Sequence, residues 1–129
     1  MPETRAAADR KTVLIVDDDP DILHMLTRYL EREEMTVISV LDALQALDVI
    51  STHEIDMVIT DYNMPHVNGG EFLRQLKETP QLSEIPVVVM SAFLPPAQSD
   101  ELLKEGAAFF LEKPLNLDSL VAMLRFSGF

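Results

Sequence analysis

Residues 13–20 read VLIVDDDP, an uninterrupted apolar run that ends in three aspartates and a proline. The run is short and rich in β-branched residues, which is typical of a strand buried on both faces of a parallel sheet. Asp19 and Pro20 can then begin a helix, because Asp caps helix N-termini and Pro is tolerated at the first helical position. This stretch therefore predicts a strand, an acidic turn and a helix in direct succession.

Outward from this stretch, strand and helix patterns alternate along the chain. Further apolar runs predict strands over 35–40, 57–60, 87–90 and 108–111. Apolar residues at helical spacing predict helices over 22–30, 42–52, 70–78, 97–105 and 117–125. Five alternating strand and helix pairs with short connections predict a doubly wound α/β fold around a parallel sheet.

The length and the first residues set the domain organisation. The chain has 129 residues, which suits one domain with a real core but not two. Residues 1–10 are polar and Ala-rich without periodicity, so we expect a flexible N-terminal lead before a single domain over 11–129.

Composition argues against several classes of function. No apolar run is long enough to span a bilayer and none near the start resembles a signal peptide, so we expect a cytoplasmic protein without a membrane partner. The absence of cysteine excludes disulfides, thiolate zinc sites and thiol catalysis. Ten basic residues against 22 acidic ones give a net charge of −12, which argues against direct binding of nucleic acid.

Four of the predicted strands are followed by a group that could handle phosphate or metal. These groups are the aspartates 17–19, then Asp61, Ser91 and Lys113. Because the carboxyl ends of parallel strands share one edge of a sheet, we expect the four groups to meet in one crevice. Such a crevice would make a phosphoryl-transfer site. It would contain acidic residues that bind a cation, a nucleophilic carboxylate, a hydroxyl and an ammonium.

A set of motifs carries a resemblance to a known family. The motifs are IVDDDP (15–20), VITDYNMP (58–65), Asn68-Gly69, VVVMSA (87–92) and FFLEKP (109–114). In this order and at these separations they resemble the receiver domain of bacterial two-component response regulators, from about Lys11 to the end. The resemblance implies a flavodoxin-like, five-stranded parallel sheet of order 2-1-3-4-5, a phosphoaspartate made from a histidine kinase's phosphohistidine, and a Mg²⁺ requirement.

The resemblance also implies roles for the acidic residues. It makes Asp61 the phospho-acceptor, and a carboxylate can attack phosphorus to form an acyl phosphate. Asp17 and Asp18 match the acidic pair of the family. Since Mg²⁺ prefers hard oxygen ligands, we expect Asp18, Asp61 and the backbone carbonyl of Asn63 to bind it directly. Asp17 is expected to act through water or by orienting Asp18.

Three further positions carry family roles. The resemblance places the Lys113 ammonium on the phosphoryl oxygens and implies that the Lys113-Pro114 bond is often cis. Ser91 matches the conformational Ser/Thr whose hydroxyl donates to a phosphate oxygen. Phe110 matches the aromatic switch residue, although an aromatic residue in a strand is more often simply core.

The resulting prediction is a signalling switch that assists only its own phosphorylation and dephosphorylation and is not otherwise an enzyme. Its expected partners are a sensor histidine kinase or histidine phosphotransfer protein on the side of helix 22–30, and a downstream effector protein or domain. The face of the last two predicted helices, 97–105 and 117–125, is expected to carry phosphorylation-dependent docking or homodimerisation.

Two other classes of protein could share the fold. A flavodoxin-type electron carrier would need a loop rich in Ser, Thr and Gly after the first strand, and the aspartates at 17–19 would repel a flavin phosphate. A pseudo-receiver that only binds partners would lack part of the acidic, hydroxyl and lysine set, which is intact in this chain.

Overall fold

The computed structural model describes residues 10–126, which form five strands and five helices in strict alternation. The strands are β1 (Thr12–Val16), β2 (Thr36–Val40), β3 (Met57–Asp61), β4 (Val87–Ser91) and β5 (Phe109–Glu112). The helices are α1 (Pro20–Arg32), α2 (Ala43–Thr52), α3 (Gly69–Glu78), α4 (Pro96–Lys104) and α5 (Leu117–Phe126). Apart from Arg10, the expected N-terminal lead lies outside the described residues.

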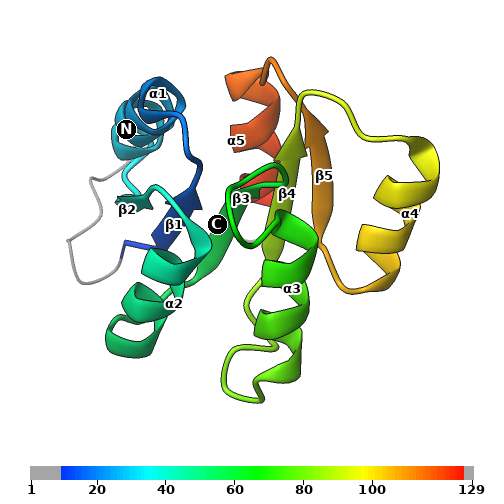
Figure 1. Ribbon diagram of the computed structural model, residues 1–129. Coiled ribbons are helices and arrows are strands. Elements are labelled where there is room, and N and C mark those ends of the chain that lie inside the picture. The colour runs from blue at the N-terminus through cyan, green and yellow to red at the C-terminus, as the bar shows by residue number, and fades with distance from the viewer. Residues whose placement is uncertain (1–9, 127–129) are drawn as a thin grey trace.

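The strands form one sheet of order β2-β1-β3-β4-β5, and every neighbouring pair is parallel (Figure 1). The predicted doubly wound fold with strand order 2-1-3-4-5 is therefore confirmed. Because β1 lies between β2 and β3, the direction of winding reverses beside β1. A crevice forms at such a reversal, outside the carboxyl ends of the strands.

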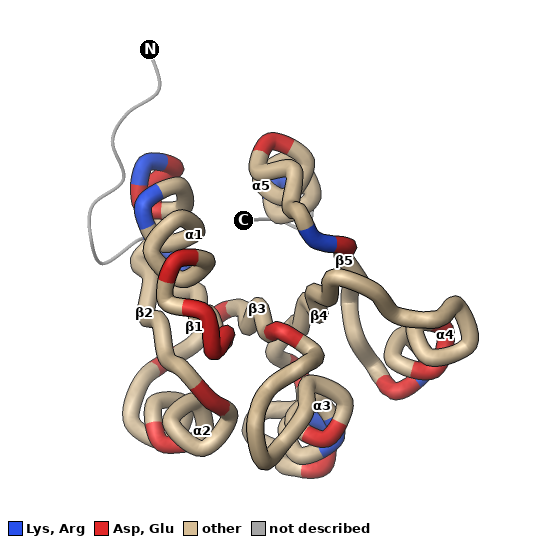
Figure 2. The backbone as a smooth tube through the Cα atoms, turned by 45° about the horizontal axis from the view of Figure 1, so that its top comes forward, with Lys and Arg blue, Asp and Glu red and all other residues tan. Residues whose placement is uncertain are grey.

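Helices cover both faces of the sheet. Figure 2 shows α1 and α5 on one side of the strands and α2 and α3 on the other. The alternation of side chains along β1 explains this arrangement: Val13 and Ile15 pack into the core under α1 and α5, whereas Leu14 and Val16 pack into the core on the opposite face. A strand buried on both faces must be apolar throughout, which is the pattern that residues 13–16 show.

The helix starts follow from capping residues. Asp19 caps α1 by accepting a hydrogen bond from the backbone N–H of Asp21, and Pro20 occupies the first turn, as predicted. Asp42 and Asn68 cap α2 and α3 in the same way. The fourth helix starts at Pro96 rather than 97 and ends at Lys104 rather than 105. Its N-cap position holds Pro95, whose side chain has no hydrogen-bond acceptor.

Strands β3 and β4 each extend one residue past the carboxyl end of their apolar runs. β3 ends at Asp61 and β4 ends at Ser91, and both polar residues are buried. Asp61 pairs with Met90, and Ser91 pairs with Glu112. The polar groups are thus fixed by the sheet itself rather than by flexible loops. Among residues 10–126, no helix has the length and apolar character that a membrane span requires.

Candidate functional site

The acidic residues that follow β1 and end β3 meet at the carboxyl edge of the sheet. Figure 2 shows acidic segments at the ends of β1 and β3, and a basic segment beyond β5, near the same edge. Asp17, Asp18 and Asp61 each present a carboxylate oxygen, and these oxygens all lie within 4.8 Å of one another. Asp17 and Asp61 are buried, whereas Asp18 is exposed at the mouth of the cluster.

Lys113 bridges two of these carboxylates. Its Nζ lies 2.8 Å from Asp17 Oδ2 and 3.2 Å from Asp61 Oδ1. Lys113 follows the last residue of β5, and its side chain is 18% exposed. The ammonium therefore enters the cluster from the carboxyl end of β5. The backbone N–H of Lys113 donates to the Ser91 carbonyl, and the Lys113-Pro114 peptide bond is cis. The structure therefore brings Lys113 to the edge where the sequence predicts it.

Both oxygens of Asp17 already have partners. Oδ1 accepts a hydrogen bond from the backbone N–H of Asp19, and Oδ2 accepts one from Lys113. The Asp17 backbone N–H donates to the carbonyl of Val40 in β2. Asp17 thus connects the acidic turn to the sheet and to Lys113. Asp18 and Asp61 are left as the two carboxylates with more freedom to take an external ligand.

Burial and the neighbouring charges together raise the pKa values of both Asp61 and Lys113. Burial raises the pKa of Asp61, and the nearby charge of Asp17 raises it further, while Lys113 partly offsets both effects. Burial alone would lower the pKa of Lys113. The hydrogen bond to Asp17 and the attraction of the Asp61 and Asp17 charges outweigh burial, so the pKa of Lys113 is raised. The ammonium therefore stays protonated at neutral pH.

Gly69 allows the loop after β3 to fold back onto Asp61. Its backbone N–H donates to the Tyr62 carbonyl at 2.7 Å. A Cβ atom at this position would lie 2.7 Å from both the Asp61 carbonyl oxygen and Tyr62 Cα, which is too close for any side chain. Glycine at 69 is thus required by the close approach of α3 to the strand end that carries the candidate nucleophile.

Ser91 lies buried at the end of β4, and its hydroxyl has two partners. Ser91 Oγ donates to the Phe93 carbonyl at 3.0 Å and accepts from Asn63 Nδ2 at 3.2 Å. The sequence identified Asn63 only for its backbone carbonyl. Its side-chain contact with Ser91 joins residues 28 positions apart, and nothing in the spacing of the sequence predicts it.

Phe110 is half-buried in β5. It pairs with Val89 across the sheet and packs against the core on the side of α2, α3 and α4. This position is that of an ordinary core residue at the sheet edge, and its role as a switch stays a prediction.

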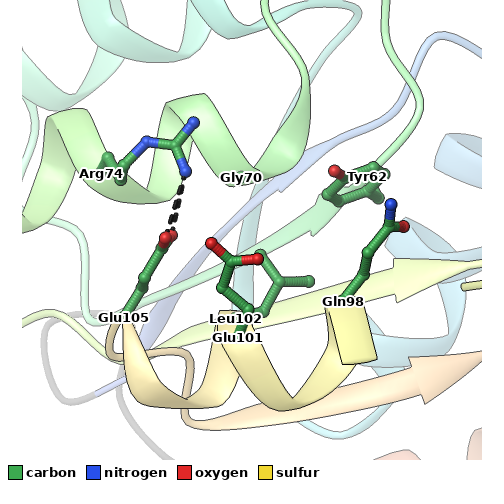
Figure 3. A pocket seen from close by; sticks show the side chains of 7 residues that line it. All are labelled: Tyr62, Gly70, Arg74, Gln98, Glu101, Leu102 and Glu105. Atoms are coloured by element: carbon green, nitrogen blue, oxygen red, sulfur yellow. Dashed lines mark hydrogen bonds and ion pairs between the residues drawn. The ribbon is translucent and has the colours of Figure 1, made fainter. Parts of the chain in front are cut away.

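A small cavity lies between α3 and α4, away from the acidic cluster. Its volume is about 100 Å³, and Tyr62, Arg74 and Glu101 are among its lining residues (Figure 3). None of its lining residues belongs to the group of Asp17, Asp18, Asp61 and Lys113. The cavity is therefore separate from the acidic cluster, and the ion pair of Arg74 with Glu105 lies at its edge.

The comparisons with known proteins agree with the geometry. Residues 13–125 match the family model described as "Response regulator receiver domain", and the chain belongs to this family of signalling domains. Two-component response regulator ORR3 of Oryza sativa is 39% identical over 104 residues, which cover 80% of this chain and 79% of the relative. Response regulator GtcR of Aneurinibacillus migulanus is 36% identical over 117 residues, or 89% of this chain and 46% of the relative.

Solved structures share the same fold. The chemotaxis response regulator CheY4 of Vibrio cholerae superposes with a TM-score of 0.84 at 28% identity, covering 91% of this chain and 98% of that structure. The chain spans about half the length of GtcR and of Two-component response regulator ORR7 of Oryza sativa, at 46% and 50%. The chain therefore has the fold of a receiver domain and belongs to the receiver domains of two-component response regulators.

Proposed function

We propose that this receiver domain is a phosphorelay switch in which Asp61 accepts a phosphoryl group. The observation that carries the proposal is the position of Asp61. Asp61 ends a buried strand and is 5% exposed. Its carboxylate lies 3.2 Å from the Lys113 ammonium, and carboxylate oxygens of Asp17 and Asp18 lie within 4.8 Å. Phosphoryl transfer requires a nucleophilic oxygen in a controlled position. A carboxylate that the sheet holds beside a fixed cation meets this requirement.

The chemical step conserves atoms and charge in a simple way. A carboxylate oxygen of Asp61 forms a bond to phosphorus, while the bond from phosphorus to the donor's histidine nitrogen breaks. The electron pair of that bond stays on the imidazole, which the donor protein retains. Little covalent chemistry is left for the acceptor domain, so its contribution is positioning and stabilisation of charge.

Lys113 is the residue that we expect to stabilise the transferred group. In the structure its ammonium lies between Asp17 and Asp61. A phosphoryl group on Asp61 would bring equatorial oxygens into this region, and the ammonium could move onto them without leaving its strand end. The charge of Lys113 would then offset part of the repulsion between the phosphoryl oxygens and Asp17.

The acidic cluster fits a hard divalent cation such as Mg²⁺. Three carboxylate oxygens within 4.8 Å of one another face one ammonium, so the cluster keeps an excess of negative charge. We assign Asp18, Asp61 and the carbonyl of Asn63 as ligands, with Asp17 acting through water or through Asp18. When bound, the cation supplies neutralisation of charge on the phosphoryl oxygens.

The proposed partners follow from the two ends of the site. The donor is a sensor histidine kinase or a histidine phosphotransfer protein, which approaches the exposed mouth near Asp18 and α1. The output is a downstream effector protein or domain, or a second copy of the chain, on the face of α4, β5 and α5, which would change shape when Ser91 and Phe110 change position. The proposal places this relay in the cytoplasm.

The test is phosphorylation by a small donor. Acetyl phosphate with Mg²⁺ should add one phosphoryl group to the wild type, seen by intact mass, and none to Asp61→Asn. Asp42→Asn is the matched control, because it makes the same chemical change at the N-cap of α2, where Asn caps as well as Asp. Equal labelling of Asp61→Asn and the wild type would refute the assignment.

A further inference from the structure

The hydroxyl of Ser91 makes two hydrogen bonds in this structure. Its neighbours are the carbonyl oxygen of Phe93 at 3.0 Å and the side-chain amide of Asn63 at 3.2 Å. A carbonyl oxygen can only accept, so the hydroxyl proton of Ser91 must point to Phe93. A lone pair of the same oxygen therefore faces Asn63, which presents its NH₂ group. In these two hydrogen bonds, each donor group therefore faces an acceptor.

This arrangement has a consequence for any phosphoryl group on Asp61. Ser91 has one hydroxyl proton, so it cannot donate to Phe93 and to a phosphoryl oxygen at the same time. Donation to the phosphoryl group requires the bond to Phe93 to break. Movement of the Ser91 oxygen toward the phosphoryl group would also stretch its hydrogen bond from Asn63, so this bond opposes the movement.

We propose, on the basis of the phosphorylation proposed for Asp61, that the side chain of Asn63 is a positioning residue that holds Ser91 in its resting arrangement. Asn63 lies on the loop after β3, two residues beyond Asp61, and its side chain is exposed. Its side-chain amide donates a hydrogen bond to Ser91 Oγ. Its role is to set how readily the hydroxyl leaves Phe93, in addition to the backbone role assigned to its carbonyl.

The segment controlled by this contact leads directly into α4. Phe93 is 74% exposed, and the helix starts three residues later at Pro96. The Ser91 hydrogen bond thus restrains an exposed aromatic residue in the connection to α4. Loss of that restraint frees the segment that joins the candidate site to this helix.

The test is a double-mutant cycle on Asn63 and Ser91, read by binding of beryllofluoride with Mg²⁺ to the otherwise unchanged chain. A hydrogen bond that opposes the bound state is lost in Asn63→Ala, so the apparent affinity for beryllofluoride should rise by roughly fivefold. In the Ser91→Ala background the same Asn63→Ala change should leave the affinity unaltered, because the group through which Asn63 acts is gone. Melting temperatures of all four proteins control for damage to the fold.

A second readout needs no ligand. In Asn63→Ala without beryllofluoride, the amide resonances of Phe93 and Leu94 should move toward the positions that they take in the beryllofluoride-bound wild type. A merely structural contact would change the melting temperature without this directed shift.

The outcomes separate the two proposals. An equal effect of Asn63→Ala in the wild-type and Ser91→Ala backgrounds, or unchanged Phe93 and Leu94 resonances, would overturn the positioning role of Asn63 while leaving phosphorylation intact. A wild type that neither takes a phosphoryl group from acetyl phosphate nor binds beryllofluoride would refute the proposed function, and the positioning role would fall with it.

Discussion

Helices α1 and α4 both begin at loops of the candidate site, yet they are held in very different ways. The 13 residues of α1 start at an Asp19 cap and bury Leu23, Leu26 and Leu30. Its outer side is joined to α5, because Tyr29 donates to Asp118 and Arg125 donates to the Glu33 carbonyl. Within the described chain, α4 has nine residues and one buried side chain, Leu102.

A further attachment of α4 is polar and partly exposed. Arg74 on α3 donates to both carboxylate oxygens of Glu105, which follows α4, at 3.3 and 3.1 Å (Figure 3). Such pairs add little to stability. Elements with few buried contacts open locally at low free energy, so α4 can change position while α1 stays fixed. The difference between the two helices indicates where a local charge change at Asp61 can produce movement.

The largest effect should come from removing a core leucine of α1, and the same change in α4 should cost much less. Leu26→Ala should lower the free energy of unfolding by about 3 kcal/mol, because it leaves a cavity in the core under α1. Leu102→Ala should cost about 1 kcal/mol in the global transition, since α4 can detach instead. Chemical denaturation measures both values.

Native-state hydrogen exchange provides the sharper form of this comparison. In Leu102→Ala, amides of 96–104 should exchange much faster while those of 20–32 keep their protection. Equal global losses in the two variants, with protection in α4 unchanged, would show that α4 is fixed as firmly as α1.

Mg²⁺ should stabilise the side of the site next to α1. A cation that binds the folded state adds about 1.4 kcal/mol at a concentration ten times its dissociation constant. The melting temperature of the wild type should therefore rise with added Mg²⁺, and Asp18→Ala should abolish the rise. Because relief of crowding is the cause, metal-free Asp18→Asn should be at least as stable as the metal-free wild type. A much lower melting temperature for Asp18→Asn would contradict the crowded site.

The ionisation of Asp61 gives the metal-free protein a definite pH dependence. Its pKa is raised in the folded state, first by burial and then by Asp17, so the folded state holds this proton more tightly than the unfolded state. The stabilisation is therefore complete below the unfolded pKa and is lost as pH rises through the folded pKa. Asp61→Asn should gain on the order of 1 kcal/mol at neutral pH and flatten this dependence.

Denaturation of the wild type and Asp61→Asn across a pH series, with a chelator present, measures the effect. Asp42→Asn is again the matched control, because it makes the same chemical change outside the acidic cluster and keeps an N-cap residue for α2. If Asp61→Asn has the same pH slope as the wild type, repulsion at Asp61 is not a significant cost of folding.

The cap of α1 should have a smaller effect. Asp19→Ala removes the acceptor for the Asp21 N–H and should cost about 1 kcal/mol, whereas Asp19→Asn should cost little because Asn also caps. Urea unfolding midpoints of the two variants test this. A large loss in Asp19→Asn would mean that the charge of Asp19, rather than its cap, holds the helix start.

The smallest effect should come from the tie between α3 and α4. Arg74→Ala removes a half-exposed ion pair and should change the unfolding free energy by about 0.5 kcal/mol or less. Hydrogen exchange in α4 should nevertheless rise, since Arg74 is one of its few attachments. Arg28→Ala, at an exposed position of α1, is the control and should leave exchange in both helices unaltered.

The fold and the position of the candidate site follow from the sequence alone. All-apolar runs such as 13–16 and 87–90 require cover on both faces, and their alternation with amphipathic helices leaves a parallel sheet as the solution. Parallel strands align their carboxyl ends, so Asp17, Asp61, Ser91 and Lys113 had to share one edge. Local chemistry also fixed the start of α1, because Asp19 and Pro20 act within a single turn.

The contacts between these groups cannot be read from the sequence, because they depend on the folded loops. Lys113 meets Asp17 across 96 positions and Asn63 meets Ser91 across 28, and such distances depend on how the loops pack rather than on any periodicity. The sequence also does not reveal how weakly α4 is attached. Its apolar pattern indicates a helix, but it does not indicate how many of those side chains are buried at the sheet edge. Periodicity identifies which face of an element is apolar, whereas its neighbours determine how much of that face is covered.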